Sequence, residues 1–191
     1  MRNVIISIIV SMYFIAGCSD GDVGPSSSVS VAEDAAVGGP QPVNTGNGWL
    51  PNEACSFLLP NLGTRGYKHD FGAIYYCSSP YKEIGRRDVR LANNLAYYVT
   101  GGRGVADTVK LVLNYNQPAN ASSATEQLVA ESRNLSFKAT GNDLPPSILS
   151  ALLTGQPALE TIGAFQHQVK RDDWPTGNGY EVHYIISTSL E

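Results

Sequence analysis

The stretch FQHQVKRDDWPTGNGYEVHYII, residues 165–186, decides the fold of this chain because it predicts a β-hairpin with a single register. Its centre, 174–179, is rich in the Pro, Gly, Thr and Asn residues that form turns. If Lys170 pairs with His183, the alternating side chains fall into a mostly apolar set and a polar set, one on each face. One face then carries Phe165, His167, Val169, Val182, Tyr184 and Ile186. The other carries Gln166, Gln168, Lys170, Glu181 and His183. A shift by one residue would mix the two sets, so we expect this pairing.

Three further strands are expected upstream of the hairpin, at 73–77, 94–100 and 109–115. In the last of these, apolar side chains alternate with more polar ones, as in a sheet with one buried face. The segment Gly101-Gly102-Arg103-Gly104 joins the second of these strands to the third. It lacks the spacing of a dinucleotide or phosphate loop, so we interpret it as a turn.

Between these strands and the hairpin, the apolar spacing changes to that of helices. Ser123-Ala124-Thr125-Glu126 matches a capping box, and apolar side chains recur at helical spacing up to Gly141. Asp143 is the expected cap of a second, shorter helix that has prolines at 145–146 in its first turn and ends at Gly155. The order of elements predicts the α+β class, an antiparallel sheet of about five strands with two helices packed on one face. The pattern leaves the strand order open.

The amino terminus predicts export. Arg2 is followed by an apolar run at 4–15 and then by small residues, as in a secretory signal. The segment Ile15-Ala16-Gly17-Cys18 resembles the lipobox of bacterial lipoproteins. This resemblance implies that a signal peptide, residues 1–17, is cleaved, that the Cys18 thiol is lipidated and that the new amino terminus is acylated.

A lipoprotein has two alternatives, a transmembrane helix and an ordinary cleaved signal. A transmembrane helix would need about 20 apolar residues, and the run at 4–15 is shorter than that. An ordinary cleaved signal would leave Cys18 as a chance thiol. In lipoproteins, an aspartate after the lipidated cysteine tends to retain the protein in the inner membrane, whereas this chain has Ser19. The resemblance therefore implies a lipid anchor in the outer membrane of a Gram-negative cell, facing the periplasm.

After the signal, the chain divides into a tether and one domain. Residues 18–48, the lipidated cysteine and a disordered tether, contain no aromatic, Lys or Arg residue. Aromatic residues resume at Trp49, and 49–191 is predicted to be a single globular α+β domain. Of the 13 basic residues only Arg2 precedes this domain, whereas four of the 17 acidic residues do, so the domain is nearly neutral. That balance argues against nucleic acid as the ligand.

Cys55 and Cys77 are the cysteines that remain after Cys18 is lipidated. In an exported chain we expect them to form one structural disulfide, which would stabilise the fold by roughly 3 kcal/mol. A redox pair or a metal site is the alternative. The sequence has no C-x-x-C spacing, however, and His69 is the histidine nearby.

Two sets of residues are candidates for a binding surface. Arg86, Arg87 and Arg90 belong to a basic cluster that could contact anionic headgroups or an acidic partner, unless it is only a solvated loop. Adjacent tyrosines on a strand point to opposite faces, so Tyr76 and Tyr98 could contact a protein or a glycan. Ordinary filling of the sheet by aromatic residues is the alternative.

The sequence contains no motif that predicts catalysis, a metal ion or a cofactor. We expect His167 in the core, held by a hydrogen bond, and His183 facing outward. His69 is next to Asp70, but adjacent residues in a loop rarely have the geometry in which a carboxylate orients a histidine base. Asp172-Asp173 could touch calcium, but such a loop needs more oxygen ligands at set spacing, so a solvated turn is favoured.

The sequence therefore predicts a lipid-anchored protein that is not an enzyme and that binds another envelope protein or inhibits an enzyme. One alternative is an envelope hydrolase whose site combines His69 or His167 with distant carboxylates. Another is a structural lipoprotein that assembles through an exposed strand edge. The identity of the partner and the oligomeric state stay open.

Overall fold

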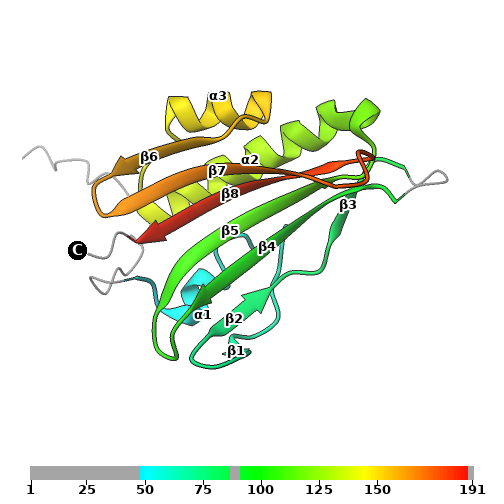
Figure 1. Cartoon of the computed structure of the whole chain (residues 1–191). Helices are drawn as coiled ribbons and strands as arrows, with labels where there is room; N and C mark the ends of the chain where they lie inside the picture. Colours follow the sequence, from blue (N-terminus) through cyan, green and yellow to red (C-terminus); the bar gives the residue numbers. More distant parts are fainter. Residues whose placement is uncertain (1–47, 87–90, 189–191) are drawn as a thin grey trace, which may run out of the picture. The chain divides into compact units, whose positions relative to one another are not determined.

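The computed structural model describes residues 48–86 and 91–188 of the chain. In these residues an antiparallel sheet of eight strands carries three α-helices on one face, which confirms the α+β class (Figure 1). The strand order is β1-β2-β4-β5-β8-β7-β6, and β3 pairs with β4 beside β2. The predicted signal peptide, Cys18 and the tether lie outside the described residues, apart from Gly48.

The elements follow one another along the chain with short connections. They are α1 (Pro51–Ala54), β1 (Lys68–His69), β2 (Tyr75–Ser78), β3 (Lys82–Ile84), β4 (Asn93–Gly101), β5 (Ala106–Tyr115), a 3₁₀ turn (Pro118–Asn120), α2 (Ala121–Thr140), α3 (Pro146–Thr154), β6 (Ala158–Ile162), β7 (Phe165–Asp173) and β8 (Tyr180–Thr188).

The prediction of about five strands and two helices was too low. The additional strands β1, β3 and β6 have two, three and five residues, and the additional helix α1 has four. β1, β3 and α1 contain too few residues to show a period, and β6 has no buried apolar side chain to mark it as a strand. The short strands form because a longer neighbour offers pairing partners. β6, for example, adds to the edge of the hairpin by pairing with β7.

The predicted hairpin register is confirmed, because Lys170 pairs with His183 between β7 and β8. The apolar set named from the sequence is buried against the helices, and His183 is on the opposite face as expected. We call the face that packs against the helices the inner face and the opposite one the outer face. β5 pairs with β8 on one side and with β4 on the other, so the same alternation continues across the sheet.

The helix ends confirm the predicted stops but not the predicted starts. Gly141 and Gly155 follow α2 and α3 with φ of 73° and 64°, the left-handed conformation that favours glycine. The capping box at Ser123 was wrong, because the 3₁₀ turn before α2 lets the helix begin at Ala121. Asp143 does not cap α3 either, since Pro145 occupies the cap position and no side chain bonds there.

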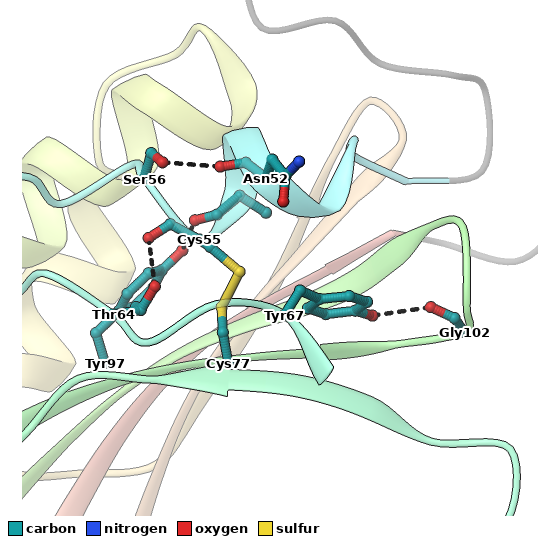
Figure 2. Close-up of a disulfide and its surroundings, with 9 residues drawn as sticks. Asn52, Cys55, Ser56, Thr64, Tyr67, Cys77, Tyr97 and Gly102 are labelled. Atoms are coloured by element: carbon teal, nitrogen blue, oxygen red, sulfur yellow. Dashed lines mark hydrogen bonds between the residues drawn. A yellow bond between two sulfur atoms is a disulfide. The ribbon is translucent and has the colours of Figure 1, made fainter. Parts of the chain in front are cut away.

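The predicted disulfide between Cys55 and Cys77 is present, and it ties the segment after α1 to β2 (Figure 2). Two hydrogen bonds hold the same segment in place. The hydroxyl of Tyr97 donates to the carbonyl of Ala54 at 2.8 Å, and that of Thr64 donates to the carbonyl of Cys55 at 2.9 Å. The chain before β1 therefore packs on the inner face. No helix in the described ranges is long and apolar enough to cross a membrane.

Candidate functional site

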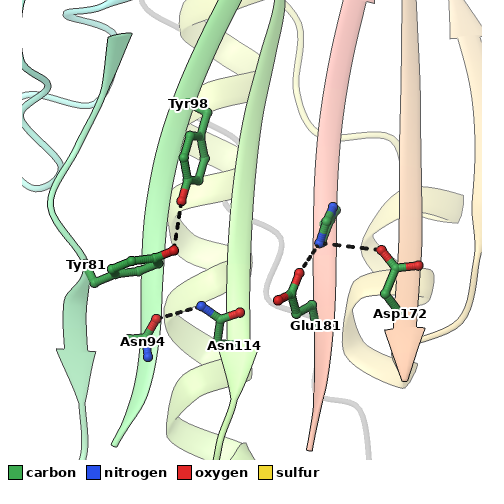
Figure 3. Close-up of polar contacts among 7 residues, drawn as sticks. Tyr81, Asn94, Tyr98, Asn114, Asp172 and Glu181 are labelled. Atoms are coloured by element: carbon green, nitrogen blue, oxygen red, sulfur yellow. Dashed lines mark hydrogen bonds and ion pairs between the residues drawn. The ribbon is translucent and has the colours of Figure 1, made fainter. Parts of the chain in front are cut away.

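The outer face of the sheet carries a polar row that runs across neighbouring strands. Asn94 of β4 pairs with Asn114 of β5, Asn114 with Glu181 of β8, and Glu181 with Asp172 of β7. Directly paired residues point to the same face of a sheet, so these four side chains form one line (Figure 3). No helix among the described residues packs over this face (Figure 1).

A groove of about 410 Å³ lies along one end of this row. Its volume falls within the roughly 300–1,000 Å³ that is usual for ligand sites. The groove is lined by aromatic, amide, carboxylate and small apolar residues, namely Tyr81, Glu83, Leu91, Ala92, Asn94, Asn114, Asn116, Trp174 and Glu181. The lining thus combines aromatic surface with both hydrogen-bond donors and acceptors.

Two aromatic rings line the groove from different parts of the chain. Tyr81 precedes β3 and is 60 % exposed. Its hydroxyl accepts a hydrogen bond from the hydroxyl of Tyr98 at 3.2 Å (Figure 3). Burial, and then this bond, raise the pKa of Tyr98 above its ordinary value, so Tyr98 stays neutral. Trp174 comes from the β7–β8 turn, where a Cβ added to Gly179 would lie 2.5 Å from its ring.

The amides of the groove are oriented by bonds to one another and to the backbone. The side chain of Asn114 donates to Oδ1 of Asn94 at 2.8 Å, and that of Asn116 donates to the carbonyl of Ala92 at 2.7 Å. In both bonds the Nδ2 atom of the amide donates, so neither bond involves Oδ1 of Asn114 or Asn116. The amides therefore retain acceptor and donor capacity toward the groove.

Beside the groove, His183 is held between two carboxylates. Its Nε2 lies 2.8 Å from Oε2 of Glu181 and 3.8 Å from Oδ2 of Asp172 (Figure 3). One ligand atom from each of these three residues lies within 4.8 Å of the others, so together they could hold a divalent cation. The same distances also fit an alternative without a cation, in which the imidazole of His183 contacts the two carboxylates directly. Sequence reasoning considered Asp172 for calcium but did not connect it with Glu181 and His183.

The residues proposed from the sequence as a binding surface have different positions. Tyr98 and Tyr76 both lie on the outer face, where Nζ of Lys110 and Nζ of Lys68 each lie 5.3 Å from the centre of one ring. Tyr98 is at the edge of the groove through its bond to Tyr81, whereas Tyr76 pairs with Thr100 farther along β4. Arg86 is exposed, and Arg87 and Arg90 lie outside the described residues.

Neither His69 nor His167, the histidines considered for a hydrolase, lies at the groove. His167 is 1 % exposed in the core, where Nδ1 lies 2.8 Å from the hydroxyl of Tyr184, as the sequence predicted. Burial lowers its pKa, and the nearby Glu160 opposes this effect. His69 is exposed in β1, at the other edge of the sheet from β6, and its Nε2 bonds the carbonyl of Gly72.

Comparison with known proteins found no match to this chain among protein-family models, curated proteins or solved structures.

Proposed function

We propose that this protein is a lipid-anchored binding or accessory protein of the bacterial envelope, without enzymatic activity, and that it engages its partner through the outer face of the sheet. The observation that carries the proposal is the groove on this face, lined by Tyr81 and Trp174. Aromatic residues on a rigid surface provide large contact area at low cost in conformational entropy.

The burial of side chains differs between the two faces of the sheet, which supports the outer face as the binding surface. Its large side chains, among them Trp49, Tyr97 and Tyr184, are fully buried beneath the helices and make the core. The tyrosines of the outer face, Tyr98 and Tyr81, instead keep part of their surface exposed. One face thus stabilises the fold, while the other presents aromatic and polar groups to the surroundings.

The anchor is proposed from the sequence alone. The lipobox at Cys18 would attach the chain to the membrane, and Ser19 favours the outer membrane. A tether of the composition found at 18–48 would let the domain reach partners in the periplasm. Labelled fatty acid should enter the wild-type protein and not Cys18→Ala; label that persists in the variant would remove the anchor from the proposal.

An envelope hydrolase is the second candidate, and the cluster of Asp172, Glu181 and His183 beside the groove is the observation that favours it. Carboxylates and a histidine are the groups that a metal-assisted or acid–base site would use. Turnover of peptidoglycan or lipid substrates that is abolished by His183→Gln would establish this alternative and contradict the non-enzymatic role.

The binding role is tested by crosslinking the full-length chain in solubilised envelope and identifying captured proteins by mass spectrometry. Lys110→Glu reverses a charge on the outer face, and Lys138→Glu makes the same change on the exposed side of α2. We expect one saturable partner that is lost with Lys110→Glu and retained with Lys138→Glu. Capture that depends on Lys138 instead would contradict the assignment of the outer face.

A further inference from the structure

We infer that the groove on the outer face binds an uncharged saccharide. This inference rests on the binding role proposed above. The groove has the two components that recognition of a sugar requires. Aromatic rings can stack on the apolar C–H face of a pyranose, and fixed polar groups can bond its hydroxyls. The lining residues provide both within one volume of about 410 Å³.

The aromatic component comes from two separated elements. Tyr81 precedes β3 and Trp174 follows β7, so β4, β5 and β8 lie between them in the sheet order. Trp174 is positioned by Gly179, because a Cβ at that residue would approach the indole ring and the carbonyl of Tyr115 to 2.5 Å each. The glycine leaves the space that the indole ring occupies.

The polar component lies between these rings. Asn94, Asn114 and Asn116 line the groove together with Glu181. A sugar hydroxyl both donates and accepts, so it needs donors and acceptors side by side, which amides supply. The bond from Asn114 to Asn94 fixes both amide planes before a ligand arrives, which reduces the entropy lost on binding.

The charge of the lining selects among saccharides. Glu83 and Glu181 contribute carboxylates, and none of the described lining residues is Lys, Arg or His. The described lining is thus formally negative, so we expect sulfated or phosphorylated glycans to bind more weakly than uncharged ones. The carboxylate of Glu181 is bonded by His183 at 2.8 Å, which makes it less available to a cationic peptide, and the tetralysine titration below tests this alternative.

The chain has two tryptophans, which gives a direct assay. Trp49 is fully buried, so quenching of fluorescence by a soluble quencher reports on Trp174. We would titrate the full-length chain, purified in mild detergent, with chitotetraose, with a heparin tetrasaccharide and with tetralysine. We expect chitotetraose to protect Trp174 in a saturable manner and the heparin fragment to have no effect.

Variants of the full-length chain, measured by calorimetry with chitotetraose, locate the site. Trp174→Ala and Tyr81→Ala should each weaken binding by about tenfold or more, since each removes a stacking surface. The matched control Tyr76→Ala, on the same face but outside the groove, should bind as the wild type does. Equal weakening by all three variants would contradict the groove as the site.

Two results would overturn the inference while leaving the binding role intact. One is no saturable protection by chitotetraose up to about 10 mM, where a ligand with a Kd near 1 mM would be about 90 % bound. The other is saturation by tetralysine alone, which would assign the groove to a cationic peptide. If a protein partner is captured from the envelope in either case, only the ligand class fails. Saccharide binding without a captured protein would instead support the inference.

Discussion

Replacing Trp49 tests how the first residues of the domain are held to the sheet. Its side chain is fully buried, its ring stacks on Phe165 with centroids 5.7 Å apart, and it meets Phe57 edge to face. Its indole N–H donates to the carbonyl of Ala139 at 2.7 Å. Its backbone exchanges two hydrogen bonds with Ala106, at 2.8 and 3.0 Å.

Two substitutions separate these contributions. Trp49→Ala removes the whole ring from a packed core, and such changes cost about 3–5 kcal/mol. Trp49→Phe retains an aromatic ring but leaves the carbonyl of Ala139 without its partner, in the last turn of α2 where helical carbonyls lack intrahelical partners. An unpartnered buried carbonyl costs about 1–3 kcal/mol, and we expect Trp49→Phe to lower the free energy of unfolding by that amount.

The free energy of unfolding would be measured by urea titration, followed by far-UV circular dichroism. Trp174→Ala is the matched control, because that ring is partly exposed and its loss should cost clearly less than that of the fully buried Trp49. A cost below about 1 kcal/mol for Trp49→Ala would refute the reasoning, since the residue could not then be a core anchor. Equal costs for Trp49→Phe and Trp49→Ala would show that the hydrogen bond, not the ring, dominates.

Three further outcomes are expected. Replacing Cys55 and Cys77 by Ala opens a loop with a sequence separation of 22 residues, which should lower the free energy of unfolding by about 3 kcal/mol in denaturant titrations; an unchanged value would contradict this. Burial lowers the pKa of His167, so the unfolded chain gains a proton more readily than the folded one as the pH falls below about 6.5. The contribution of His167 to stability should therefore be complete above that pH and decline below it, and His167→Gln should flatten this part of a stability-versus-pH curve; a slope that survives the substitution would argue against it. In Gly179→Ala the added Cβ would meet both the ring of Trp174 and the carbonyl of Tyr115, so the ring has to move and chitotetraose binding should weaken about as much as in Trp174→Ala; unaltered affinity in a variant that keeps its circular dichroism spectrum would show that the ring position is unimportant.

The sequence predicted the parts of the fold that are set by local patterns. Alternation along 165–186 determined the register of β7 and β8, because a shift would bury polar side chains. Gly141 and Gly155 marked helix ends, since glycine adopts the left-handed conformation easily. The starts of the same helices were missed, because a turn and a proline there replaced the expected side-chain caps.

The groove could not be predicted in the same way, because its residues converge through long-range pairing. Asn94 and Glu181 are far apart in the sequence, and they meet only when β4, β5 and β8 lie side by side. Tyr98 was singled out as an outward tyrosine, but its partner Tyr81 lies in a connection without strand periodicity. Knowing the strand order would have revealed the polar row, and no local signal contains that order.

The outer face as the binding face is tested most directly by photo-crosslinking in living cells. A photoreactive amino acid would replace either Tyr81, at the groove, or Phe137, on the opposite side in α2; the two are matched in exposure at 60 % and 55 %. We expect light-dependent adducts with an envelope component from position 81 and none from position 137. Adducts from position 137 alone would contradict the assignment of the outer face as the binding surface.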